Sequence, residues 1–278
     1  MTDAEGAGGP ATGAAAAGPA TGRAALTVAV LGLGEAGGRI AADLVVAGAQ
    51  VRGFDPVVPA PPGVEPAADD ADACRGAGLV LSLTTAGESE QALYQALPGL
   101  GLGAVYADAN TASPGHKQRL ARIAEQAAVP FADIAIMAPI LPRGLGTPML
   151  ASGPAAATVA SQLNGFGAAA EVLAGPAGVA AIRKLLRSVF YKGMAAAMVE
   201  ALRGARAAGC EDWLREHIAA DLAAADETTA ARLEQGTYQH AHRRVHEMAA
   251  ASDMLGELGV PPRVARASQR WLEELSEG

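Results

Sequence analysis

The sequence contains only two cysteines in 278 residues, Cys74 and Cys210. Two widely separated cysteines are too few for a disulfide scaffold, and they lack the spacing of a zinc site. We expect both to be buried thiols in a reducing cytoplasm. Aromatic residues make up 4 % of the chain, and the formal net charge is −8. Because nucleic-acid binders use basic faces and aromatic stacking platforms, nucleic acid is not expected as a partner.

Long apolar runs and a basic N-terminus are also absent from the sequence. No stretch approaches the roughly 20 strongly apolar residues that span a membrane, so no membrane segment is expected. Residues 1–24 are mostly Ala, Gly and Pro, with Asp3 and Glu5 near the start. A secretory signal needs a basic start and a strongly apolar stretch. We therefore predict that residues 1–24 form a disordered tail and that the protein is cytoplasmic.

Lysine is scarce as well. The chain has 18 arginines but only three lysines, Lys117, Lys184 and Lys192. This bias fits a GC-rich genome, and it makes each retained lysine a candidate for a specific role. At roughly 100–200 residues per domain, the length of the chain predicts one large domain or two modest ones.

The first part of the chain alternates between two patterns. Short apolar runs that stop at Gly, Asp or Ser are typical of buried parallel strands, and helical spacing follows most of them. The expected strands are residues 26–31, 51–54, 79–83, 104–107, 131–137 and 149–151. This alternation predicts an α/β fold, a parallel sheet with helices on both faces.

The pattern changes after Gly175 and Pro176. No convincing strand follows, and residues 180–208 are expected to form one long helix. A Gly-Val-Pro-Pro turn at 259–262 precedes the last helix. We predict an α/β domain at 25–177, followed by an all-α domain at 178–278.

A glycine-rich loop follows the first predicted strand and precedes a helix. Its residues spell G-x-G-x-x-G, and they are Gly32, Leu33, Gly34, Glu35, Ala36 and Gly37. In this context the first glycine allows a tight turn, the second lets a pyrophosphate approach the backbone, and the third lets the helix pack against the strand. The helix N-terminus offers free N–H groups to the anion. The loop predicts a Rossmann-type dinucleotide-binding domain.

An acidic residue is expected about 20 residues further on, at the end of the second strand. Asp55 stands there, 18 residues after Gly37. A carboxylate at this place accepts both ribose hydroxyls of adenosine and repels a 2′-phosphate, so NAD is favoured over NADP. Arg52 lies within the strand and is not placed like a phosphate binder. Thr84, after the third strand, is also assigned to the cofactor.

Four blocks together resemble the β-hydroxyacid dehydrogenase superfamily, which includes 3-hydroxyisobutyrate and 6-phosphogluconate dehydrogenases. The blocks are the glycine loop, the Asp-x-x-Thr-x-Ser-Pro loop, the Asp-x-x-x-Met-Ala-Pro segment and the Gly-x-x-x-x-x-Lys segment, at residues 32–37, 108–114, 133–139 and 178–184. Two further stretches, 187–193 and 243–248, are similar to the branch that carries a phosphogluconate dehydrogenase-like C-terminal domain of unknown function. The resemblance implies an NAD(P)-dependent oxidoreductase acting on a hydroxyl or carbonyl group.

By this resemblance Lys184 matches the family's catalytic lysine. Removing a hydride from an alcohol leaves a proton that a side chain must take, and a lysine in an apolar cleft has its pKa lowered toward working pH. Ser188 and Lys192 follow at i+4 and i+8, so all three lean to a similar helix face. Lys192 is the second lysine candidate, for substrate or phosphate binding.

The substrate loop places Asn110 and Thr111 where the family has Ser-Thr, and both can hydrogen-bond a substrate. The third block departs from the family's Ser-Gly-Gly, because Pro139 has no N–H and Met137 is bulky. Arg187 can replace that lost anion contact by bidentate pairing, or it is an ordinary solvated arginine. His242 and His246 stand at i,i+4, but no metal is expected.

Two alternatives to a hydroxyl-specific dehydrogenase remain open. One is an imine reductase with the same two-domain plan, against which the retained Lys184 argues. The other is an NAD(H)-binding sensor without turnover. The apolar helices from residue 180 onward carry more Ala, Leu and Met than one small domain can cover, so we also expect a homodimer built through the all-α domains.

Overall fold

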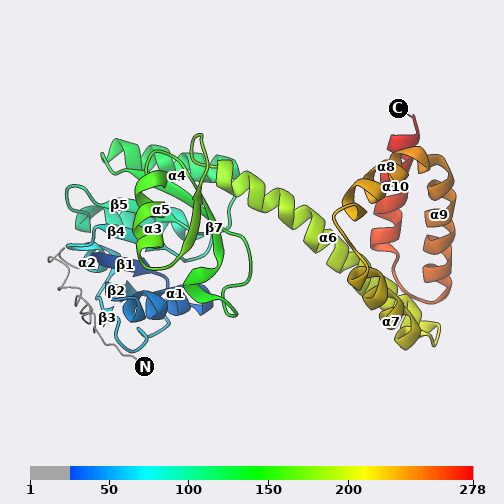
Figure 1. The fold of residues 1–278 in the computed structure, drawn as a ribbon, viewed down its shortest axis with the longest axis horizontal. Helices are drawn as coiled ribbons and strands as arrows, with labels where there is room; N and C mark the ends of the chain where they lie inside the picture. Colours follow the sequence, from blue (N-terminus) through cyan, green and yellow to red (C-terminus); the bar gives the residue numbers. More distant parts are fainter. Residues whose placement is uncertain (1–25, 278) are drawn as a thin grey trace, which may run out of the picture. The chain divides into compact units, whose positions relative to one another are not determined.

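The computed structural model describes residues 26–277, and these form two compact units that divide between Val179 and Ala180 (Figure 1). The predicted tail at 1–24 lies outside the described residues. Among the described residues, no helix combines the length and apolarity that crossing a lipid bilayer requires.

The first unit is built on one eight-stranded sheet, with strand order β3-β2-β1-β4-β5-β6-β7-β8. All neighbouring strands are parallel except β6 and β7. The strands are β1 Thr27–Leu31, β2 Gln50–Phe54, β3 Glu65–Pro66, β4 Leu79–Ser82, β5 Val105–Asp108, β6 Phe131–Ile136, β7 Pro148–Ser152 and β8 Ala169–Val172. The predicted α/β class is confirmed.

The predicted parallel sheet is found in all but one pair of neighbouring strands. β7 runs antiparallel to β6, with Asp133 opposite Ser152. Only a loop and the 3₁₀ turn Gly144–Gly146 join the two strands, and a parallel connection needs a crossover of a dozen or more residues, usually a helix. Two edge strands, β3 and β8, were not predicted. β3 has two residues, one of them proline, and β8 is mostly exposed, so neither has a buried-strand pattern.

Helices cover both faces of this sheet. The helices are α1 Glu35–Val46, α2 Asp70–Cys74, α3 Ser89–Ala96, α4 Pro114–Gln126 and α5 Ala156–Gly165. One apolar cluster joins α1 and α5 to the sheet, and a second joins α2, α3 and α4 to it. Helix α4 begins with an N-terminal cap, in which Ser113 Oγ accepts a hydrogen bond from the N–H of His116 and Pro114 occupies the first turn.

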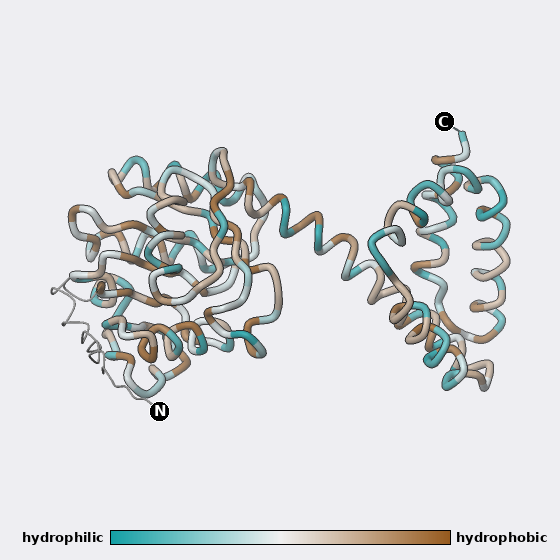
Figure 2. Tube along the Cα trace, viewed as in Figure 1, coloured by the Kyte–Doolittle hydropathy of each residue, from teal (hydrophilic) through white to brown (hydrophobic). Residues whose placement is uncertain are grey.

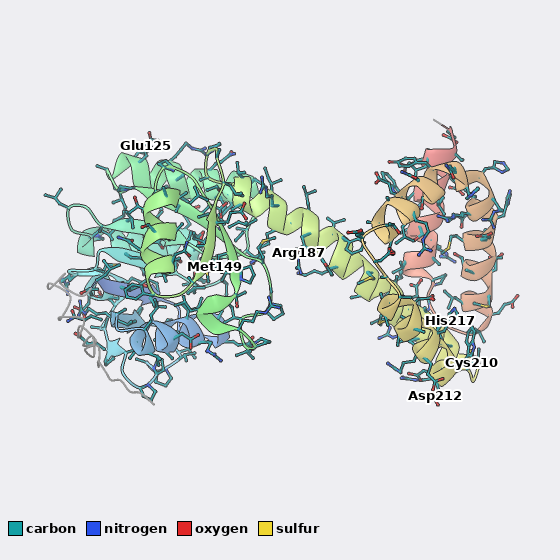
Figure 3. All side chains as sticks on the ribbon, viewed as in Figure 1. Glu125, Met149, Arg187, Cys210, Asp212 and His217 are labelled. Atoms are coloured by element: carbon teal, nitrogen blue, oxygen red, sulfur yellow. The ribbon has the colours of Figure 1, made fainter. Side chains whose placement is uncertain are left out.

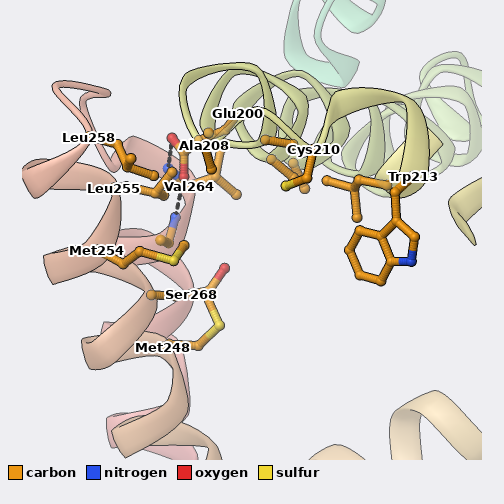
Figure 4. A pocket seen from close by; sticks show the side chains of 17 residues that line it. Glu200, Ala208, Cys210, Trp213, Met248, Met254, Leu255, Leu258, Val264 and Ser268 are labelled. Carbon is orange, nitrogen blue, oxygen red and sulfur yellow. Dashed lines mark hydrogen bonds between the residues drawn. The ribbon is translucent and has the colours of Figure 1, made fainter.

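The second unit is helical throughout its described residues. Its helices are α6 Val179–Ala207, α7 Glu211–Ala223, α8 Thr229–Gln239, α9 Ala241–Glu257 and α10 Arg263–Glu277. Glu200 on α6 caps the start of α10, where its carboxylate accepts from the N–H groups of Arg263, Val264 and Ala265 at 2.6 to 2.8 Å (Figure 4). This cap ties α10 to α6.

The two cysteines differ in their exposure to solvent. Cys74 is buried, and burial, followed by the charge of Asp70, raises the pKa of its thiol to about 12. Cys210 is exposed, which corrects the prediction that both thiols are buried. It lies in the short connection before α7, a helix that buries none of its own residues.

Candidate functional site

The glycine loop lies where β1 ends and α1 begins, and two of its glycines allow no side chain. Gly32 has φ +87°, and a Cβ there would stand 2.6 Å from the Leu83 carbonyl oxygen. A Cβ on Gly37 would overlap the Gly32 carbonyl oxygen. The first glycine therefore permits the turn and the third permits close packing of helix against strand, as the motif predicts.

Gly34, unlike Gly32 and Gly37, has open space around it. No heavy atom lies within 4 Å of where its Cβ would be, and no side chain caps α1 at this residue. The first N–H groups of a helix have no partner within the helix, and here they include those of Glu35 and Ala36. The dipole of the helix adds partial positive charge at the same end. Open space beside these donors suits a phosphate or pyrophosphate.

Asp55 is held next to this loop by backbone hydrogen bonds. Its Oδ2 accepts from the N–H of Leu33 at 2.8 Å, and its Oδ1 accepts from Val57 and Val58 at 2.8 and 2.9 Å. Burial alone would raise the pKa of Asp55, but these three donors outweigh it and the pKa lies below its ordinary value. The carboxylate is therefore fixed in place and ionised near neutral pH.

A pocket of about 340 Å³ opens beside these residues. It brings together Gly32, Asp55 and Thr84, which the sequence assigned to a cofactor. Phe54, Pro56, Asp70, Thr85, Glu88, Gln91, Ala92 and Gln95 complete its lining. The lining includes three carboxylates and no lysine or arginine.

Arg52, on the strand that leads to this pocket, is engaged elsewhere. Its guanidinium pairs with Glu65 at 3.3 Å and with Asp72 at 3.4 Å. The open backbone cradle and the fixed Asp55 fit the pyrophosphate and ribose of an adenine dinucleotide. A 2′-phosphate finds no cation among the residues that line the pocket.

Asp70 is a pocket residue that the sequence did not reveal. It is 6 % exposed, and no described residue forms a hydrogen bond or ion pair with it. Burial, and then the charges of Asp69 and Asp55, raise its pKa to about 6. In the sequence this position is part of an Asp-Asp pair that is typical of a helix start, and Asp69 does cap α2 by accepting from Asp72 N–H at 2.6 Å.

The predicted substrate loop follows β5. Asn110 is buried, and its Nδ2 donates to Asp108 Oδ1 at 2.5 Å and to Ser82 Oγ at 3.0 Å. Among the described residues its Oδ1 has no hydrogen-bond partner. Thr111 is exposed. The loop therefore holds one fixed amide whose Oδ1 is buried and without a partner among the described residues, followed by the exposed residue Thr111.

A buried ion cluster supports this loop, and the sequence did not predict it. Lys117 Nζ lies 3.1 Å from Asp108 Oδ2 and 3.0 Å from Asp133 Oδ1, and it donates to the Asp108 carbonyl at 2.8 Å. All three side chains are at most 1 % exposed. Since Asp108 also holds Asn110, Lys117 fixes the loop through it. The scarcity of lysine was the one sequence signal at this position.

In the third block, residues 133–139, two positions offer no free backbone N–H. The N–H of Met137 donates to the Pro148 carbonyl at 2.9 Å, and Pro139 has no N–H. Neither Met137 nor Pro139 therefore offers a free backbone N–H to a substrate carboxylate.

The remaining predicted residues all lie on α6 of the second unit: Lys184, Arg187, Ser188 and Lys192. The Arg187 guanidinium lies over the Tyr191 ring, 4.1 Å from its centroid. Figure 3 labels Arg187 on this helix. Lys192 is exposed. Their roles toward a substrate stay predictions.

Comparisons with solved structures support the two-part plan. A conserved hypothetical protein from Sinorhizobium meliloti 1021 is 29 % identical, with 89 % of this chain and 87 % of that one covered and a TM-score of 0.58. The conserved protein MTH1747, of unknown function and described as similar to 3-hydroxyacid dehydrogenases, is 27 % identical over 91 % and 97 %, with a TM-score of 0.58. A reductive aminase from Aspergillus terreus, solved with NADPH and ethyl levulinate, is 19 % identical over 91 % and 94 %, with a TM-score of 0.74. At that identity the aminase shows the fold alone.

Family models match both parts of the chain. Residues 205–275 match a domain of unknown function, DUF1932, which agrees with the branch that the C-terminal half resembles. No match was found among curated proteins. Residues 27–173, just over half of the chain, match the model described as the NAD binding domain of 6-phosphogluconate dehydrogenase. The chain therefore belongs to the family of that NAD-binding domain and has a dehydrogenase-like NAD(P)-binding fold.

Proposed function

We propose that this protein is an NAD-dependent oxidoreductase that acts on a hydroxyl or carbonyl group of a small organic substrate. The observation that carries the proposal is the cradle at Gly34 next to the fixed carboxylate of Asp55. The cradle suits a pyrophosphate, and the carboxylate suits a ribose with free hydroxyls. When bound, the dinucleotide supplies the hydride acceptor or donor.

The chain's own residues then have to place the substrate and move a proton. We assign general acid–base catalysis to Lys184, from its match to the family lysine. Asn110 Oδ1 and the Thr111 hydroxyl are proposed to hydrogen-bond the substrate's reacting end. Arg187, Ser188 and Lys192 are proposed to bind an acidic portion of it.

An imine reductase is the second candidate. The observation in its favour is the third block, where Met137 and Pro139 give a substrate carboxylate no backbone donors. A third reading is a sensor that binds NAD(H) without turnover. To separate the three, NADH oxidation is followed by absorbance over a panel of aldehydes, keto acids and imines. Turnover of carbonyl compounds supports the proposal, turnover of imines alone favours the second candidate, and binding without turnover favours the sensor.

Cofactor choice gives a prediction at Asp55. Wild-type protein should bind NADH more tightly than NADPH, because the carboxylate accepts the ribose hydroxyls and repels a 2′-phosphate. Asp55→Asn should reduce the preference for NADH over NADPH by about tenfold, as expected for removing one nearby charge. Nucleotide fluorescence titrations measure both affinities. Tighter binding of NADPH by the wild type would show that Asp55 does not have this role.

We further propose a homodimer. Among the described residues of the second unit, α7 and α8 bury no residue, and only two large apolar side chains, Leu255 and Leu272, are buried. Apolar residues recur along α6 (Figure 2). Its exposed ones include Ile182, Leu186, Val189, Phe190, Tyr191, Met194 and Val199. An apolar pocket of about 460 Å³ lies between α6, α7, α9 and α10, with Trp213 and Met254 in its lining (Figure 4).

So much exposed apolar surface is unusual for a small monomeric domain, and a second copy covers it without requiring any other partner. Sedimentation equilibrium at micromolar concentration should therefore give twice the chain mass. The double variant Leu186→Asp and Phe190→Asp should shift the protein toward monomer or unfold its second unit, because it places charges in the proposed interface. A wild-type monomer at that concentration would contradict the homodimer.

A further inference from the structure

Asp70 is a largely buried residue whose carboxylate lines a pocket and has no donor among the described residues. Its side chain lines the same pocket as Asp55 and Thr84, it is 6 % exposed, and no described residue pairs with it. Burying a carboxylate without a hydrogen bond costs free energy. The oxygens of Asp70 are not fully buried, so the carboxylate is open to the pocket, where a ligand group can donate to it.

We propose that Asp70 is a second specificity-determining residue for the cofactor: it accepts a hydrogen bond from the adenosine of NAD and, with Asp55, excludes a 2′-phosphate. The adenosine offers an exocyclic amine and two ribose hydroxyls as donors, whereas a 2′-phosphate replaces one donor with negative charge. Among the described residues, no lysine or arginine lines the pocket to neutralise that charge. The inference rests on the proposed NAD-dependent function.

The groups around Asp70 make this selection depend on pH. The charges that act on Asp70 are those of Asp69, which caps its own helix, and of Asp55, just after β2. Glu88, just before α3, lines the same pocket. Cys74 and Tyr106 are neutral neighbours, since burial raises both of their pKa values. Arg52 is held by Asp72.

The pKa of Asp70 is raised to about 6, so the side chain is mostly neutral at pH 5 and mostly ionised at pH 8. Repulsion of the 2′-phosphate therefore grows as the pH rises through 6. If a bound 2′-phosphate shifts the pKa of Asp70 by one unit, the preference for NADH over NADPH should grow about tenfold between pH 5 and pH 8.

The test is calorimetric titration of the full-length protein with NADH and with NADPH at pH 5, 6, 7 and 8. Asp70→Asn keeps the size of the side chain and removes its charge. At pH 8 it should raise NADPH affinity relative to NADH by about tenfold compared with wild type, and at pH 5 it should match wild type. The ionisation of the 2′-phosphate itself is common to both proteins and cancels in this comparison.

Asp69→Asn is the matched control. Asparagine caps a helix as well as aspartate does, and Asp69 is exposed and outside the pocket lining. In this variant the preference for NADH over NADPH should still depend on pH. The midpoint of that dependence should lie at slightly lower pH, because one negative charge near Asp70 is lost. Equal selectivity of Asp70→Asn and wild type at every pH would overturn the assignment of Asp70. Failure of the wild type to bind either nucleotide would instead overturn the proposed function.

Discussion

Replacing Lys184 with methionine should lower kcat by roughly 10²- to 10⁴-fold, the range that general acid–base help typically contributes. Methionine keeps most of the volume of the lysine stem and removes the group that carries the proton. Affinity for NADH should change little, because the glycine loop and Asp55 belong to the other unit. Steady-state kinetics with the substrate identified in the panel measure the loss in kcat. A fluorescence titration with NADH measures the affinity for the cofactor.

Lys192→Met is the comparison for that variant. Lys192 is exposed and two helical turns further along α6. If it only holds substrate, its loss should raise KM more than it lowers kcat. Near wild-type kcat in Lys184→Met together with an inactive Lys192→Met would mean that the wrong lysine was assigned. If both variants stay active, neither lysine carries the proton, and the result would favour an imine reductase over a hydroxyl-specific dehydrogenase.

Replacing Lys117 with methionine should destabilise the first unit by about 3–5 kcal/mol, the usual cost of breaking a buried ion pair. The variant leaves the carboxylates of Asp108 and Asp133 buried together without their shared cation. Asp108 would then no longer hold Asn110 in place, so substrate affinity should fall as well.

Hydrogen exchange at the amides of β5 and β6 measures this effect within the first unit, whereas tryptophan fluorescence would not, since Trp213 and Trp271 both lie in the second. Lys192→Met, an exposed substitution, should change stability by less than about 0.5 kcal/mol. Unchanged exchange in Lys117→Met would show that the buried cluster does not stabilise the loop.

The glycine loop and Asp55 could be predicted because short-range geometry along the chain determines which residue types stand there. The glycine loop could be predicted because tight turns and close helix–strand contacts impose residue types within a few positions, and Gly32 and Gly37 show those constraints in the structure. Asp55 could be predicted because a strand end places it next to that loop. The boundaries of β2, β4, β5 and β6 differ from the expected ones by one residue.

Tertiary packing explains what the sequence did not predict. Asp70 and Lys117 are polar residues on short or amphipathic helices, where an exposed position is the ordinary expectation. Their burial depends on which strands and helices surround them. The strand at β7 was predicted but its antiparallel direction was not, because an apolar run carries no mark of strand direction, and the absence of a crossover helix was the one signal.

In the proposed function, the open space at Gly34 is the pyrophosphate cradle of NAD. Calorimetric titration of Gly34→Val with NADH tests it most directly, because the added side chain meets no protein atom within 4 Å at its Cβ and should not disturb the fold. Gly101→Val, at another glycine with open surroundings, is the matched control. We predict that wild type and Gly101→Val bind NADH alike and that Gly34→Val binds about a hundredfold more weakly, a loss of ~2.8 kcal/mol. Binding by Gly34→Val as tight as that of wild type would contradict the account.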